Sequence, residues 1–174
     1  METGHGCCGG IALDRRRLLA GAVGLMAFRP LLVRAASGNY EAMVLACIDP
    51  RMQEPVFDYL KKRGLGGQYS QFTIAGAAIA VVAPKFADWH KAFWDNVGAS
   101  TELHNIKRVI VIDHRDCGAA KIAYGADSIA TPEKENATHR AVLADFRKQV
   151  GARAPKLVVE TGLMALDGSM MMFS

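Results

Sequence analysis

Long hydrophobic runs are missing from this 174-residue chain. Its apolar stretch from Leu18 to Phe28 has only 11 residues and contains Gly21 and Gly24. A transmembrane helix needs about 20 apolar residues, so no stable membrane span is expected.

The chain also lacks a concentrated basic surface. Its formal charge is +4, and residues 1–35 carry most of it, with five arginines against one glutamate and one aspartate. The remainder has no basic patch interleaved with aromatic residues, so nucleic-acid binding is not expected. There is no internal repeat or low-complexity segment, and the length suits one domain with a genuine core.

Residues 1–35 are typical of a targeting segment. The run Asp14-Arg15-Arg16-Arg17-Leu18-Leu19 is close to the twin-arginine pattern, and Val33-Arg34-Ala35 offers a cleavage site before Ala36. We therefore expect residues 1–35 to be a cleaved twin-arginine export signal and residues 36–174 a single domain in the periplasm or outside the cell. An amphipathic N-terminal helix of a cytoplasmic protein and an uncleaved anchor are the alternatives.

Cysteine is scarce, and its placement matters. Cys7 and Cys8 belong to the expected signal, which leaves Cys47 and Cys117. Two cysteines in an oxidising compartment usually suggest a disulfide. Each of these two cysteines stands beside His, Asp or Arg, which favours binding of a metal by the thiolates. The twin-arginine route exports proteins that have already folded, so a metal bound before export would protect the thiolates from oxidation.

Apolar runs alternate with amphipathic segments along the mature chain. This order predicts an α/β fold with a mainly parallel central sheet of four or five strands flanked by helices. The expected strands are 40–48, 68–74, 108–113 and 156–159, the expected helices 52–62, 84–97, 118–124 and 133–150, and a hairpin-like tail covers 163–173.

Two short motifs carry the chemistry. Cys47-Ile48-Asp49-Pro50-Arg51 and His114-Arg115-Asp116-Cys117-Gly118 each follow a predicted strand, at the edge of the sheet where ligands collect. Two thiolates and one imidazole form the ligand set of an open, catalytic zinc site. We predict that Cys47, His114 and Cys117 bind Zn²⁺, which lowers the pKa of a bound water towards ~7 and yields a hydroxide nucleophile.

The Cys-x-Asp-x-Arg and His-x-x-Cys motifs resemble those of the β-class carbonic anhydrases, and the resemblance extends more loosely over residues 40–173. It implies reversible hydration of CO2 to bicarbonate by a zinc-bound hydroxide, and assembly as a homodimer or larger homo-oligomer. It also implies catalytic roles for Asp49 and Arg51: the aspartate pairs with the arginine and orients the zinc-bound water. In some members this aspartate moves onto the metal, so Asp49 is a candidate fourth ligand.

Around the motifs, Ala75-Gly76 matches a family pattern whose usual polar neighbours are replaced here by Thr73, Ile74 and Ala77. This departure predicts a less polar pocket wall. Asp116 is interpreted as a residue that structures the loop, and Gly118 as the residue that permits a tight turn. The candidate proton shuttles are His90, His104 and His139, although surface or helix-face positions are more typical of such histidines.

Three alternatives stay open at this point. Short members of the superfamily hydrolyse carbonyl sulfide or carbon disulfide on the same kind of site, and the ligands alone do not distinguish these substrates from CO2. A non-catalytic zinc-binding protein and a protein with a Cys47–Cys117 disulfide are the other two. Catalysis is favoured because Asp49 and Arg51 have no evident purpose in a storage site.

Overall fold

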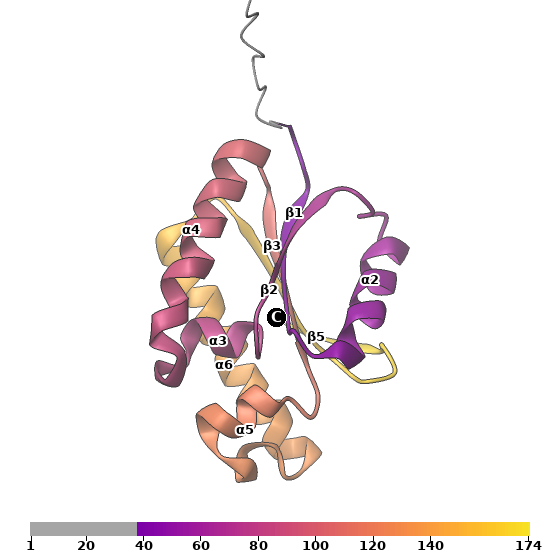
Figure 1. Ribbon diagram of the computed structural model, residues 1–174, viewed down its shortest axis with the longest axis vertical. Helices are drawn as coiled ribbons and strands as arrows, with labels where there is room; N and C mark the ends of the chain where they lie inside the picture. Colours follow the sequence, from indigo (N-terminus) through magenta and orange to yellow (C-terminus); the bar gives the residue numbers. More distant parts are fainter. Residues whose placement is uncertain (1–37) are drawn as a thin grey trace, which may run out of the picture. The chain divides into compact units, whose positions relative to one another are not determined.

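The computed structural model describes residues 38–174, so the expected export signal at residues 1–35 lies outside the described residues. A five-stranded sheet forms the centre of this part, with helices on both of its faces (Figure 1). The strands are β1 (Ala42–Ala46), β2 (Tyr69–Thr73), β3 (Arg108–His114), β4 (Val158–Met164) and β5 (Met170–Phe173).

The strand order is β2-β1-β3-β4-β5. The first four strands are parallel to their neighbours, and β5 runs antiparallel to β4. The predicted α/β fold with a mainly parallel sheet is therefore confirmed.

Five α-helices and three 3-10 turns connect the strands in the described part. The helices are α2 (Gln53–Lys62), α3 (Ala78–Val82), α4 (Ala87–His104), α5 (Gly118–Tyr124) and α6 (Pro132–Arg153), and the turns are η1 (Pro50–Met52), η2 (Pro84–Phe86) and η3 (Ala126–Ile129). Figure 1 shows α3, α4 and α6 over one face of the sheet and α2 over the other.

The central strands are apolar because both of their faces are covered. In β1, Met43 and Leu45 belong to the core cluster that contains the buried residues of α3, α4 and α6, whereas Val44 belongs to the cluster of α2. Successive side chains of a strand point to opposite faces, so a strand buried on both sides is a continuous apolar run. This arrangement makes β1 and β3 a rigid support for the loops that follow them.

Several predicted boundaries differ from those in the structure. The helix expected at 84–97 begins with η2 and continues to His104, where Asn105 in a left-handed conformation (φ 47°) ends it. Helix α3 was not predicted, since a five-residue apolar run has no helical periodicity to detect. Strand β4 is longer than predicted and continues through Thr161-Gly162 into the hairpin with β5.

Within residues 38–174, no helix has both the length and the apolar character that crossing a membrane requires.

Candidate metal centre

The two motifs meet because β1 and β3 are direct neighbours. Ala46 pairs with Ile112 in the parallel ladder, so the loop after β1 and the end of β3 lie at the same edge of the sheet. Cys47 follows β1, His114 is the last residue of β3, and Cys117 precedes the first residue of α5. All three residues are buried, and one potential ligand atom from each lies within 4.8 Å of the other two.

The His114 ring is oriented by its own loop. Its Nδ1 lies 2.8 Å from the carbonyl oxygen of Arg115. A carbonyl oxygen only accepts, so Nδ1 carries the hydrogen and Nε2 carries the free lone pair. This Nε2 is buried and has no hydrogen-bond partner among the described residues. A buried acceptor left free beside two sulfurs fits a metal ligand.

The two sulfurs are electrostatically linked. Interaction with the neighbouring Cys117 thiol lowers the pKa of Cys47, against the opposing effect of burial. The same pairing, together with burial, raises the pKa of Cys117. Two adjacent thiols resist carrying two negative charges, and a divalent cation would neutralise both, so this donor set fits Zn²⁺.

Gly76 closes the site on the side of Cys47. Its N–H donates to Cys47 Sγ at 3.2 Å, and its φ is +87°. A Cβ added here would lie 2.6 Å from the Cβ of Ala119. The conformation and the close approach to α5 both require glycine.

We expect Gly76→Ala to lower the free energy of unfolding by about 2–4 kcal/mol, because it adds a clash to an unfavourable backbone conformation. Gly64→Ala is the matched control, since Gly64 has a similar φ of +73° but nothing within 4 Å of an added Cβ. Urea unfolding of both variants measures the difference. Equal losses of stability would show that the contact with Ala119 is unimportant.

Asp49 and Arg51 form a closely bonded pair next to these ligands. Arg51 donates to Asp49 Oδ1 from Nε and from its backbone N–H, both at 2.9 Å, and to Oδ2 from Nη2 at 2.6 Å. These bonds lower the pKa of Asp49 to about 2, so the carboxylate is ionised at neutral pH. Asp49 Oδ2 lies 3.9 Å from His114 Nε2, which places the carboxylate beside the ligand atoms while Arg51 holds it.

Arg51 also joins the two motifs. Its Nη1 donates to Asp116 Oδ2 at 3.0 Å, and its Nη2 to the carbonyl oxygen of Asp116 at 3.2 Å. Lys121 bonds the other carboxylate oxygen of Asp116 at 3.1 Å. These contacts agree with the interpretation of Asp116 as a residue that structures the loop.

A cavity of about 350 Å³ opens beside Cys47 and Asp49. Its lining is mostly apolar and includes Ala75, Gly76, Phe86, Trp89, Ala119 and Ile122. None of Thr73, Ile74 and Ala77, the residues predicted to make this wall less polar, lines the cavity. Ala77 is buried in the core and Ile74 packs against it. Ala75 and Gly76, which lie between these two residues in the sequence, line the cavity.

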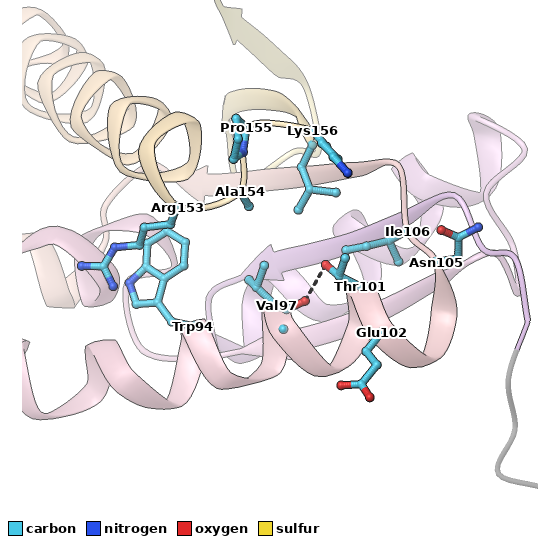
Figure 2. Close-up of a pocket in the computed structure, with 12 residues that line it drawn as sticks. Trp94, Val97, Thr101, Glu102, Asn105, Ile106, Arg153, Ala154, Pro155 and Lys156 are labelled. Carbon is cyan, nitrogen blue, oxygen red and sulfur yellow. Dashed lines mark hydrogen bonds between the residues drawn. The ribbon is translucent and has the colours of Figure 1, made fainter.

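A larger cavity, of about 590 Å³, lies elsewhere and contains no predicted site residue. It is lined by residues that precede β3 and β4, such as Ile106 and Leu157, and so lies at the opposite end of these strands. Figure 2 shows Trp94 and Arg153 at this cavity, where the guanidinium lies 4.5 Å from the indole ring.

Comparison with known proteins decides the family. A family model described as "Putative carbonic anhydrase" matches residues 37–147, well over half of the chain, and this range includes both motifs. The chain belongs to this carbonic anhydrase family.

Relatives of this carbonic anhydrase family member include uncharacterized proteins of two Rickettsia species. The protein of Rickettsia conorii is 36% identical over 126 residues, covering 72% of this chain and 68% of the relative. That of Rickettsia bellii is 35% identical over 126 residues, covering 72% and 77%.

Solved structures show the same fold at low identity. The β-carbonic anhydrase CafA of Aspergillus fumigatus superposes with a TM-score of 0.52 at 14% identity, covering 81% of this chain and 78% of that one. CafD of the same fungus gives 0.51 at 10% identity, covering 78% and 90%.

The sequence interpretation missed Glu135 and did not predict that His139 is buried; both residues belong to α6. Glu135 accepts from Arg115 Nη1 at 2.8 Å and from the backbone N–H of Asp116 at 2.6 Å. His139 is fully buried, and its Nδ1 lies 2.8 Å from Asp113 Oδ2. A signal was present in the sequence, because both positions continue the helical stripe of buried residues formed by Val142, Leu143, Phe146 and Val150.

The candidate proton shuttles do not reach the cavity. His139 lies on a face of α6, as the helix-face interpretation expected, but that face is the buried one: the side chain is fully buried against Asp113. His90 contacts the carbonyl oxygen of Ala83 at 3.1 Å, and His104 contacts Ser70 Oγ at 2.7 Å. None of the three histidines lines the cavity beside Cys47.

Proposed function

We propose that this protein binds one Zn²⁺ per chain through Cys47, His114 and Cys117 and catalyses the reversible hydration of CO2 to bicarbonate. The observation that carries the proposal is the grouping of one potential ligand atom each from Cys47, His114 and Cys117 within 4.8 Å of one another, with the free, buried Nε2 of His114 next to the Asp49–Arg51 pair. Bound zinc supplies the Lewis acidity that lowers the pKa of water towards ~7, so that a nucleophile is available at neutral pH.

Asp49 orients the attacking water in this proposal. The Asp49 carboxylate accepts a hydrogen bond from the water. Arg51 donates three hydrogen bonds to this carboxylate, which keep it ionised and fix its orientation. Because Arg51 already satisfies both carboxylate oxygens, we favour the orienting role over direct ligation as a fourth ligand. The proton that leaves the water passes to buffer, since Asp49 is the only ionisable side chain besides Cys47 among the residues lining the cavity.

The cavity suits a small apolar substrate. CO2 has no net dipole and needs no hydrogen-bond donor to enter, so an apolar wall such as Trp89, Phe86 and Ile122 admits it without a desolvation cost. Asp49 is then the main polar side chain that a substrate meets in this cavity.

The test combines a stopped-flow assay of CO2 hydration with zinc analysis on one sample of the full chain. We expect about one zinc per chain and rapid hydration that a chelator abolishes and added zinc restores. One zinc per chain without hydration would contradict the proposed reaction, and absence of zinc would contradict the proposed site.

The apolar lining also favours a second candidate, the hydrolysis of carbonyl sulfide or carbon disulfide. Both are linear analogues of CO2 that need no hydrogen-bond donor to enter an apolar cavity, so the same site and cavity would accept them. Release of hydrogen sulfide from these compounds by the zinc-loaded chain, at a rate above that of CO2 hydration, would support this candidate. Fast CO2 hydration with negligible hydrogen sulfide would exclude it.

We further propose a homodimer or larger homo-oligomer. Ile48 and Ile122 line the cavity and are 56% and 63% exposed, an unusual position for large apolar side chains unless a second copy covers them. Light scattering during gel filtration would give the mass, and a monomer at micromolar concentration would contradict the proposal.

Export by the twin-arginine route, with cleavage near Ala35, also remains a proposal. It rests on the arginine run at residues 15–17 and the apolar stretch that follows. Mass spectrometry of the protein from periplasmic and cytoplasmic fractions would reveal the location and the mature N-terminus.

A further inference from the structure

A single peptide group lies between His114 and a buried carboxylate of α6. The carbonyl oxygen of this group belongs to Arg115 and accepts from His114 Nδ1 at 2.8 Å. Its N–H belongs to Asp116 and donates to Glu135 Oε1 at 2.6 Å. Carboxylate, peptide and imidazole therefore form one hydrogen-bonded chain whose free end is His114 Nε2.

Histidines that bind metals commonly donate their other ring N–H to a carboxylate, which fixes the tautomer and strengthens the donor nitrogen. Here the peptide stands between the two groups. Hydrogen bonds in series polarise one another, so a carboxylate that accepts from the peptide N–H makes the peptide oxygen a better acceptor for Nδ1–H. We propose that Glu135 is a positioning residue that orients His114 and strengthens Nε2 as a zinc donor through the 115–116 peptide.

The surroundings of Glu135 support this role. Its side chain is only 9% exposed, and burial of a carboxylate is costly unless it is paired and hydrogen-bonded. Arg115 Nη1 bonds the second oxygen, Oε2, at 2.8 Å, and Arg115 Nη2 bonds Asn136 Oδ1 at 2.9 Å. Glu135 also lies in the first turn of the 22-residue helix α6, where the helix dipole favours a negative charge. The carboxylate is thus held in place from several sides.

The same bond stabilises the turn between two proposed ligands. Asp116 has a φ of +53°, a left-handed conformation that costs a non-glycine residue about 1 kcal/mol. Its N–H is held by Glu135 and its carbonyl oxygen by Arg51. Because this residue lies directly between His114-Arg115 and Cys117, its conformation decides whether both ligands face the same point.

The test compares Glu135→Ala and Glu135→Gln in the full chain, with Glu133→Gln as a matched control. Glu133 lies in the same helical turn but is exposed, and the hydrogen bonds of Arg115 and of the Asp116 N–H go to Glu135 and Asn136 instead. We expect Glu135→Ala to weaken zinc binding by about 10–100-fold, measured by competition with a chromophoric chelator. Glu135→Gln should lose less, because its amide oxygen still accepts from Asp116, and Glu133→Gln should bind zinc like the parent.

A second readout separates positioning from mere stability. In the zinc-loaded protein, the His114 Nδ1–H proton resonance should move upfield in Glu135→Gln, because its acceptor has become weaker. Parent-like zinc affinity and an unmoved resonance, with a lower unfolding temperature alone, would overturn the proposal. If Glu135→Ala fails to fold, Glu135→Gln carries the test.

This inference rests on the proposed zinc site but not on the proposed reaction. A parent protein that binds zinc without hydrating CO2 would contradict the reaction and leave the comparison of zinc affinities intact. A parent that binds no zinc would overturn both.

Discussion

Replacing Cys117 with serine should abolish zinc binding and reduce CO2 hydration to the uncatalysed rate. A serine hydroxyl does not ionise near neutral pH and is not a zinc ligand in sites of this type, so one of the three protein donors is lost. Cys117 is only 1% exposed and lies beside Cys47 and His114, and no other described cysteine is near enough to replace it. Zinc analysis and stopped-flow kinetics on the same sample measure both losses.

The substitution should also lower the unfolding temperature in buffer that contains zinc. A ligand at about 1,000 times its Kd contributes about 4 kcal/mol, which corresponds to roughly 8–16 °C for a domain of this size. The parent stripped by a chelator should unfold at about the temperature of the variant, because both lack the bound ion. Cys7→Ser is the matched control, since it changes the same residue type outside the motifs. A Cys117→Ser protein that retains one zinc would contradict the proposed ligand set.

The sheet and the meeting of the two motifs could be predicted because the information is local. The β-branched run of β3 and the apolar run of β1 mark strands buried on both faces, and each motif follows its strand directly. Once the two strands are neighbours in a parallel sheet, their carboxyl ends necessarily share an edge. The proximity of Cys47 to His114 and Cys117 follows from that geometry.

The partners of the loop could not be predicted in the same way. Glu135 bonds the Asp116 N–H across 19 positions, and His139 meets Asp113 across 26. Such pairs depend on how α6 packs against the end of β3, which no local pattern fixes. Glu135 and His139 are polar residues within an apolar helical stripe, and this position in the sequence predicts that they are buried. It does not predict which residue each of them bonds.

Helix boundaries were wrong for a related reason. The helix expected to end at residue 97 continues through Gly98 to His104, where Asn105 supplies the left-handed cap. Tertiary packing outweighs the unfavourable propensity of a single glycine, which costs only about 1 kcal/mol in a helix.

Replacing Asp49 with alanine should keep zinc in place and lower kcat/KM for CO2 hydration by about 10²–10³-fold, the range for removal of one preorganised polar group at a reacting centre. The carboxylate lies 3.9 Å from His114 Nε2 and is held by Arg51, so it is placed to accept from the attacking water rather than to retain the metal. Its pKa of about 2 means that it stays ionised from pH 5 to 9. Any pH dependence of the parent rate in that interval therefore belongs to another group.

Asp116→Asn is the matched control for Asp49→Ala, because Asp116 is the other carboxylate that binds Arg51. The Asp116 side chain is 53% exposed, and ion pairs at such exposure contribute little, so we expect less than about a tenfold change in rate. If Asp49→Ala retained full activity, the Asp49–Arg51 pair would have no part in catalysis. If Asp49→Ala lost zinc together with activity, Asp49 would be a fourth ligand, and the site would be closed in the resting protein. Zinc content and kcat/KM measured on both variants thus distinguish a residue that orients water from one that binds the metal.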